Sequence, residues 1–169
     1  MLDTLLKNIE SLFISLLVLL NLNSTPSETL IENKVIKVID GDTIEVVVNK
    51  KIEKIRLIGL DTPETVDPRK ELECFGIEAS EELKNLVEGK IVKLDSDESQ
   101  DNKDRYGRLL RYVILDDKNI NLYMIENGYG FEYTFKSKYK YQKEFKEAER
   151  NAQKNNLGLW SNEVCEYSN

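Results

Sequence analysis

Five charged side chains in this chain are of the types that hydrolyse phosphodiester bonds, namely Asp42, Arg56, Asp61, Glu64 and Arg108. They stand in three short motifs. The motifs are Asp40-Gly41-Asp42-Thr43, the stretch from Arg56 to Asp61-Thr62-Pro63-Glu64, and Asp104-Arg105-Tyr106-Gly107-Arg108. Carboxylate oxygens are the ligands that hard divalent cations prefer, and an arginine fork can hold two phosphate oxygens at once. The chain has no histidine, which excludes every mechanism that relies on an imidazole.

Each motif has an ordinary structural explanation when it is taken alone. Asp-Gly pairs are common in turns, and the second motif could be a charged loop in which Pro63 forces Thr62 toward an extended shape. Arg56 could form a surface ion pair, and Arg108 could be a turn charge that faces solvent. Taken together, the motifs supply only hard oxygen ligands, which favours Ca²⁺ or Mg²⁺ over Zn²⁺ or Cu²⁺.

The chain resembles the staphylococcal nuclease (thermonuclease) family from about Val35 to Trp160. The resemblance rests on the three motifs, the first extended by Val38-Ile39, and on two further segments, Phe75-Gly76-Ile77-Glu78-Ala79 and Gly158-Leu159-Trp160-Ser161. Each segment alone is a weak signal, but five in the family's order make the resemblance specific. It implies an α+β fold, namely a small five-stranded OB-fold barrel with about three packed helices.

The resemblance also implies roles for the charged side chains. In the family, calcium is bound by two aspartates and a backbone carbonyl, two arginines contact the scissile phosphate, and a glutamate is the proposed general base. The positions that match are Asp42, Asp61 and the carbonyl of Thr62 for the metal, and Arg56, Glu64 and Arg108 for catalysis.

Substrate-binding residues are implied less directly. Arg105 and Tyr106 match family positions near the terminal phosphate and the base of the nucleotide. The family has two later tyrosines that contact the nucleotide, and here the segment 131–136 departs from the family in length. Tyr133 is the first candidate and Phe135 the second. Their rings could stack on a base, although packing in the core explains them equally well.

Composition agrees with one domain and a leader. The chain has 169 residues, of which 40% are hydrophobic, enough for a core. Its formal net charge of −7 is unusual for a protein that binds nucleic acid, but net charge governs long-range steering rather than local chemistry. The charge is also uneven, because Tyr133–Trp160 contains seven basic and three acidic residues.

Residues 1–27 are expected to be a signal peptide or an N-terminal membrane anchor, which leaves residues 28–169 as the nuclease-like domain. The apolar run Leu12–Leu20 has the length of a signal-peptide core and is short for a membrane span. The leader is not basic, so an uncleaved anchor or an extra buried helix stays open. We therefore expect a secreted or extracytoplasmic protein, with a possible membrane tether through Leu12–Leu20.

The chain has two cysteines, Cys74 and Cys165. An even number of cysteines in an exported protein indicates a disulfide, but two free thiols are the alternative. A bridge requires Cα atoms within about 7 Å, which the sequence does not give.

Patterns of apolar residues predict five strands, at 34–39, 43–48, 52–60, 91–94 and 108–115. A first helix is predicted at 75–87, with Ile77, Leu83, Leu86 and Val87 on its apolar face. A short helix should begin at Asn121 as the capping residue and end at Gly128. A third helix is predicted at 139–154, with Phe145, Ala148 and Ala152 along one stripe. The acidic segment 95–104 lacks the glycine of an EF-hand and is expected to be a solvated loop.

These features predict a calcium-dependent nuclease that acts on DNA and RNA with little sequence preference, with 3′-phosphate products implied by the resemblance. We expect a monomer without an obligate protein partner. The alternative is a non-catalytic nucleic-acid-binding OB-fold module. Modules of that kind typically lack parts of the catalytic set, whereas this chain retains all of them.

Overall fold

A computed structural model of the chain describes residues 30–65 and 73–161. Its strands are β1 (Val35–Asp40), β2 (Thr43–Val48), β3 (Lys51–Leu57), β4 (Leu60–Asp61), β5 (Lys93–Asp95), β6 (Leu109–Leu115), β7 (Lys118–Asn119) and β8 (Phe131–Glu132). Its helices are α2 (Gly76–Val87), α3 (Ile120–Glu126), α4 (Gln142–Lys154) and the 3₁₀ turn η1 (Gly158–Trp160).

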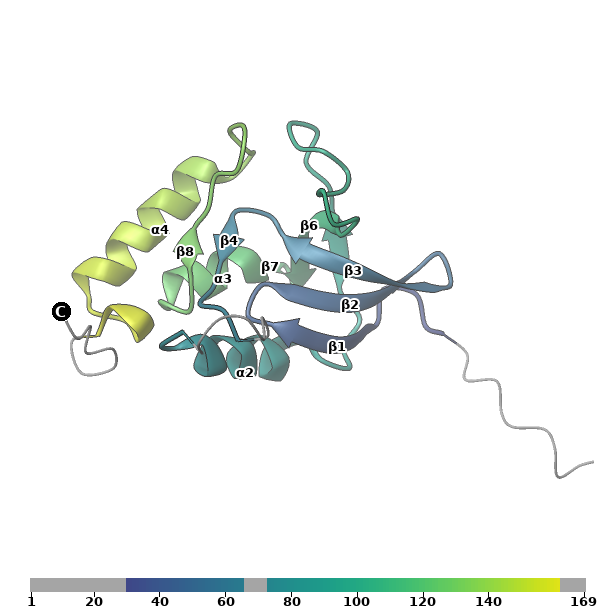
Figure 1. The fold of residues 1–169 in the computed structure, drawn as a ribbon, viewed down its shortest axis with the longest axis horizontal. Coiled ribbons are helices and arrows are strands. Elements are labelled where there is room, and N and C mark those ends of the chain that lie inside the picture. The colour runs from purple at the N-terminus through teal and green to yellow at the C-terminus, as the bar shows by residue number, and fades with distance from the viewer. Residues whose placement is uncertain (1–29, 66–72, 162–169) are drawn as a thin grey trace, which may run out of the picture.

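The main sheet has the order β1-β2-β3-β6-β5, and β7 pairs with β6. β3 and β6 run parallel and the other pairs are antiparallel. The short strands β4 and β8 form a separate antiparallel ribbon. In Figure 1, α2 lies beneath the β1–β3 hairpins. Helix α4 lies at the left of the view, beside β8 and away from strands β1–β3. The structure therefore confirms the predicted α+β class.

The expected barrel is only partly reproduced among the described residues. The edge strands β1 and β5 do not form a ladder with each other. An isolated bridge joins Lys34 to Ile91 just before these strands, and backbone bonds run from Val92 to Asn33 and from Val35 to Lys90. The two edges approach each other through this short connection, and a closed barrel is not established.

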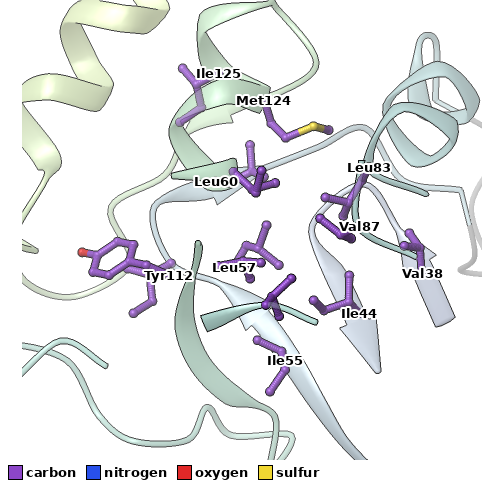
Figure 2. Packing of buried hydrophobic residues seen from close by; sticks show 14 of the residues in the cluster. Val38, Ile44, Ile55, Leu57, Leu60, Leu83, Val87, Tyr112, Met124 and Ile125 are labelled. Atoms are coloured by element: carbon purple, nitrogen blue, oxygen red, sulfur yellow. The ribbon is translucent and has the colours of Figure 1, made fainter. Parts of the chain in front are cut away.

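The core lies between the sheet, α2 and α3 (Figure 2). Ile44 and Ile55 are opposite each other on β2 and β3, and both are fully buried. Leu83 comes from α2 and Met124 from α3, and both side chains are inaccessible to solvent. Burying a side chain of this size stabilises the fold by roughly 1.5–3 kcal/mol, so this cluster fixes the strands that carry the charged motifs.

Two predicted elements differ from the structure near the first and second motifs. The strand predicted at 52–60 is broken after Leu57, because Gly59 takes a φ of +76° that turns the chain into β4. The buried face of α2 also differs from the prediction, because Ile77, which was expected on that face, is 47% exposed. The buried face consists of Gly76, Ala79, Leu83 and Val87.

The capping residue of α3 was predicted wrongly. Asn119 accepts the capping hydrogen bond from the backbone N–H of Leu122. Asn121 is fully buried within the helix. Its side chain accepts from the N–H of Val113 and donates to the carbonyl of Ile58. Asn121 therefore ties the β3–β4 turn to β6, and it does not cap a helix.

Helix α4 begins at Gln142 instead of Tyr139. Tyr139 is buried just before it, and its hydroxyl donates to Glu132. The predicted stripe of Phe145, Ala148 and Ala152 is buried as expected.

Some predictions fall outside the described residues. The leader 1–27 with its apolar run is one, and Cys165 is another. Cys74 is disulfide-bonded, but the pairing with Cys165 stays a prediction. Among the described helices, none has the length and apolarity needed to cross a membrane.

Candidate active site

Arg56 joins the first and second motifs. Its Nη2 atom lies 2.9 Å from Oδ2 of Asp42 and 2.7 Å from Oδ1 of Asp61. Its Nη1 atom donates to the backbone carbonyls of Leu57 and Leu60, on either side of the turn between β3 and β4. The turn therefore folds back on the arginine that precedes it, which brings Asp61 beside Arg56.

Asp42 is the buried centre of this arrangement, with 6% of its surface exposed. Its Oδ1 atom accepts from the hydroxyl of Thr43 at 2.8 Å, and Oδ2 accepts from the backbone N–H of Thr62 at 3.4 Å. Carboxylate oxygens of Asp42 and Asp61 thus lie within bonding distance of one Arg56 nitrogen, and the backbone of Thr62 is adjacent. The three predicted metal ligands are brought together.

Acidic groups are crowded here. Burial and the neighbouring charge of Asp42 raise the pKa of Asp40 to about 7. Burial also raises the pKa of Asp61, against the opposing effect of Arg56. Burial thus disfavours the ionised forms of these carboxyl groups, even with Arg56 beside Asp61. The oxygen donors therefore fit a hard divalent cation, which would favour their ionised forms.

The protein would supply few ligands to such an ion. Among residues 30–65 and 73–161, no three acidic, cysteine or histidine side chains are grouped as a metal-binding cluster. The predicted donors are the carboxylates of Asp42 and Asp61 and the Thr62 carbonyl. A cation held by so few protein groups keeps part of its water shell and binds weakly.

Two glycines let the Asp61–Thr62 segment approach its neighbours closely. A Cβ atom at Gly41 would lie 2.7 Å from Oγ1 of Thr62. One at Gly130 would lie 2.6 Å from the carbonyl oxygen of Asp61. Contacts this short do not occur for real Cβ atoms, so the absence of a side chain at both positions sets where Asp61 and Thr62 sit.

Arg108 stands immediately before β6 and completes the arrangement. Its Nε atom donates to Oδ2 of Asp104 at 2.7 Å, and Nη1 donates to the hydroxyl of Thr43 at 3.2 Å. Burial opposes ionisation of Asp104, but the hydrogen bonds from Arg108 outweigh it and lower the pKa of Asp104. We name Asp42, Thr43, Arg56, Asp61 and Arg108 the carboxylate–arginine cluster.

Glu64 lies on the segment that follows the cluster. Its backbone N–H donates to Glu73, and its Oε1 atom accepts from the N–H of Thr65 at 3.0 Å. A Cβ atom at Gly76 would lie 2.6 Å from Thr65, so the start of α2 presses on this segment. Glu64 is not among the residues that line the cleft described next.

A cleft of about 730 Å³ opens beside the cluster. Of the residues predicted to act on a substrate, it is lined by Arg56, Asp61, Arg105, Tyr106, Arg108 and Tyr133, but not by Asp42, Thr62 or Glu64.

Exposed aromatic rings stand in this cleft. Tyr106 is 69% exposed, and the Arg105 guanidinium lies 4.7 Å from its ring centre. Tyr133 and Phe135 are 42% and 61% exposed, with ring centres 6.3 Å apart. Both later aromatics therefore belong to the cleft surface, and the alternative of core packing is wrong for them.

Two loops, residues 97–101 and 133–139, contribute to the lining of the cleft, and we name them the outer wall. The side-chain nitrogen of Gln100 donates to Oγ of Ser137 at 3.0 Å and to the carbonyl of Lys138 at 3.2 Å. Ser99 donates to the same carbonyl at 2.9 Å. The predicted solvated loop is thus tied to a segment about 40 residues away, which no sequence signal indicated.

Sequence reasoning also left three motif residues without a role. Thr43 links Arg108 to Asp42, Asp104 orients Arg108, and Asp40 accepts the backbone N–H of Asp42. All three stand inside the motifs, so their position beside the assigned residues was the available signal.

Several proteins similar to this chain are named as nucleases. The model of the family described as staphylococcal nuclease homologue matches residues 54–162. Thermonuclease of Staphylococcus hyicus is 41% identical over 129 residues, which cover 76% of this chain and 75% of that protein. Thermonuclease of Staphylococcus intermedius is 37% identical over 124 residues, 73% of each. Endonuclease YncB of Bacillus subtilis is 36% identical over 126 residues, 74% of this chain but 59% of that protein.

Proposed function

This chain belongs to the staphylococcal nuclease family, and we propose that it is a calcium-dependent nuclease that hydrolyses DNA and RNA with little sequence preference. The observation that supports the proposal best is the bonded path from Arg108 through Thr43 and Asp42 to Arg56. Together with Asp61, which pairs with Arg56, this path holds two guanidinium groups and two carboxylates at the edge of a cleft of nucleotide size.

The two arginines differ in how far the protein already occupies them. Arg56 is bonded to two carboxylates and two backbone carbonyls. Among the described residues, Arg108 is bonded through Nε and Nη1 only, which leaves Nη2 available. Arg108 is therefore the better placed to donate to a phosphate oxygen as negative charge builds in the transition state. Arg56 contributes positive charge at the cleft edge and holds Asp42 and Asp61 together.

Aspartate oxygens would hold the metal. Asp42, Asp61 and the carbonyl of Thr62 are the proposed ligands, and a bound calcium ion would offset charge on a phosphate oxygen. Glu64 is proposed to orient or deprotonate the attacking water. Family analogy gives in-line attack on phosphorus and departure of the 5′ oxygen, which yields a 3′-phosphate.

The aromatic side chains suggest how the strand is held. Tyr106, Tyr133 and Phe135 offer exposed ring faces in the cleft, and every base has a face that can stack on them. Recognition by stacking and phosphate contacts carries little sequence information. This accounts for activity on both DNA and RNA.

The test is hydrolysis of single-stranded DNA and RNA, first with millimolar Ca²⁺ and then with excess chelator. We expect cleavage of both with Ca²⁺ and loss of cleavage with chelator. Full activity in chelator would contradict the metal requirement. Strand binding without any cleavage would favour a non-catalytic nucleic-acid-binding module.

The proposal extends to an extracytoplasmic monomer that begins near Glu28. Its support is the apolar run Leu12–Leu20 in the sequence together with the bonded state of Cys74. Disulfides persist in oxidising compartments. The intact mass of natively exported protein, before and after reduction, tests the cleavage point and the disulfide separately.

A further inference from the structure

The segment Tyr133–Lys143 has a charge unlike that of the chain as a whole. It contains four lysines and no acidic residue, in a protein whose net charge is −7. The lysines are Lys136, Lys138, Lys140 and Lys143, and all four are exposed. We name this stretch the lysine segment.

Most of this positive charge is not neutralised by ion pairs. Lys136 lies 3.6 Å from Asp101, but both side chains are about 70% exposed, so this pair is weak. Lys140 lies over the ring of Tyr141. The hydrogen bond with Tyr141 raises the pKa of Lys140, and the charges of Asp95 and Asp97 add to this shift.

Lys138 and Lys143 have no ion pair among the described residues. The acidic groups nearest to the segment in the chain are Glu132, which immediately precedes it and pairs with Lys146, and Glu144, which follows it on α4. The ammonium groups of Lys138 and Lys143 are thus available to an anionic partner.

The backbone of the lysine segment is held firmly. Tyr139 is buried, and its ring lies so close to Gly59 that a Cβ atom there would be 2.7 Å away. The N–H of Lys140 donates to Asp97 at 2.8 Å, and the carbonyl of Lys138 accepts from Ser99 and Gln100. Because the buried Tyr139 and the partly buried Tyr141 alternate with exposed lysines, anchoring the aromatic rings leaves the ammonium groups in solvent.

The lysine segment continues directly from the cleft. Lys136, Ser137 and Tyr139 line the cleft, and the chain then leads over Lys140 to the start of α4 at Gln142. In Figure 1 this stretch forms the loop at the top of the molecule that leads into α4. A strand that leaves the cleft over the outer wall would therefore meet Lys138, Lys140 and Lys143.

We propose that Lys138, Lys140 and Lys143 form a phosphate-binding track for the part of a single-stranded nucleic acid that extends beyond the cleft. This rests on the proposed nuclease function. The track increases affinity for long strands without touching the scissile bond, and it offsets the repulsion between an acidic protein and a polyanion.

The test compares two substrates, a single-stranded dinucleotide that only the cleft can hold and a 30-nucleotide strand. The variant is the full chain with Lys138→Gln, Lys140→Gln and Lys143→Gln. A matched control carries Lys37→Gln, Lys51→Gln and Lys54→Gln, which removes equal charge from exposed positions on β1 and β3. Initial rates with both substrates are measured from 50 to 200 mM salt.

We expect the track variant to raise KM for the long strand by roughly tenfold at low salt and to leave kcat and the dinucleotide kinetics unchanged. The slope of log kcat/KM against log salt should become shallower by about 2, since three phosphate contacts to a single strand are lost. The control should retain wild-type kinetics.

Three results would overturn the track. One is an unchanged KM for the long strand. Another is an equal effect of the control, which would reflect net charge alone. The third is an equal loss on both substrates, which would reflect damage to the cleft. A wild-type protein that cleaves neither substrate would instead refute the nuclease function on which the track depends.

Discussion

The carboxylate–arginine cluster and the outer wall lie on the same cleft but are built in different ways. The cluster comes from strand ends and a tight turn, its Arg56 side chain is 12% exposed, and glycines set its close contacts. The outer wall comes from two loops joined by exposed hydrogen bonds, such as those from Gln100 to Ser137 and Lys138. The positions proposed to contact reacting atoms are thus fixed by packing, and those proposed to hold the rest of a strand are fixed by polar contacts open to water.

Packing also makes the cluster costly to alter. Buried charged groups that lose a partner destabilise a protein far more than exposed ones do. We therefore expect substitutions in the cluster to affect turnover strongly, and substitutions in the outer wall to affect binding and acid stability mildly.

The largest effects are expected from the arginines. Arg56→Lys and Arg108→Lys should each lower kcat by about 10²-fold or more, because lysine keeps the charge but lacks the planar fork. The two should differ in stability. Arg56→Lys should also lower the free energy of unfolding, since Arg56 holds Asp42 and Asp61, whereas Arg108→Lys should change it little.

Urea unfolding and single-turnover cleavage measure the two effects separately. Equal stability of both variants would show that Arg56 does not hold the carboxylates in solution. Near-native turnover of either variant would reduce that arginine to a surface charge.

Glu64 tests how far the cluster extends. If it accepts the proton of the attacking water, Glu64→Gln should lower the single-turnover rate by about 10²-fold, with Ca²⁺ affinity changed less than in Asp42→Asn. If its main role is the hydrogen bond from Thr65, glutamine should retain much of the activity. A near-native rate in Glu64→Gln at saturating Ca²⁺ would remove it from proton transfer.

Gly130 tests the packing half of the comparison without removing any charge. A Cβ atom there would press on the Asp61 carbonyl and on Thr62, so Gly130→Ala should displace both residues. We expect a loss of stability of about 1–3 kcal/mol and a fall in Ca²⁺ affinity measured by calorimetry. The matched control is Gly107→Ala, where nothing lies within 4 Å, although its φ of +82° adds strain of its own. If Gly130→Ala binds Ca²⁺ as tightly as the wild type, close packing does not position the ligands.

The same contrast explains what the sequence could predict. Arg56 and Asp61 are five residues apart across one turn, so local geometry was enough to bring them together. The resemblance supplied the long-range step that adds Arg108 to them. The outer wall joins Ser99 and Gln100 to residues 37 to 39 positions later, and neither loop has a pattern that shows the pairing.

Two local errors have related causes. Asn119 and Asn121 are both capable caps, and only the burial of Asn121 against Ile58 and Arg111 decides between them. Ile77 fits the helical period of α2, but Gly76 packs closely against the segment 63–65, and Gly76 and Ala79 belong to the buried face instead. Periodicity detects apolar residues, and it does not register small residues that allow close approach.

The smallest expected effect concerns Asp97, which anchors the outer wall. It accepts from the hydroxyl of Tyr112 at 2.6 Å and from the N–H of Lys140 at 2.8 Å. Burial opposes its ionisation, but the hydrogen bonds from Lys140, Tyr112 and Ser99 outweigh burial and lower the pKa of Asp97 to about 2. Its pKa in the unfolded chain is the ordinary value of 3.8.

Because the folded pKa is depressed, ionised Asp97 stabilises the fold fully above pH 3.8, and this contribution is lost as the pH falls toward 2. Asp97→Asn should therefore lower the urea midpoint of unfolding at pH 7. The difference in the free energy of unfolding between the variant and the wild type should shrink as the pH falls from 5 to 2. Turnover of a dinucleotide at pH 7 should stay near wild type, since Asp97 does not line the cleft. Urea titrations across this range measure the stability difference. A stability difference that is constant with pH would mean that these hydrogen bonds do not lower the pKa of Asp97. A large loss of dinucleotide turnover would mean that the outer wall and the cluster are not separable regions.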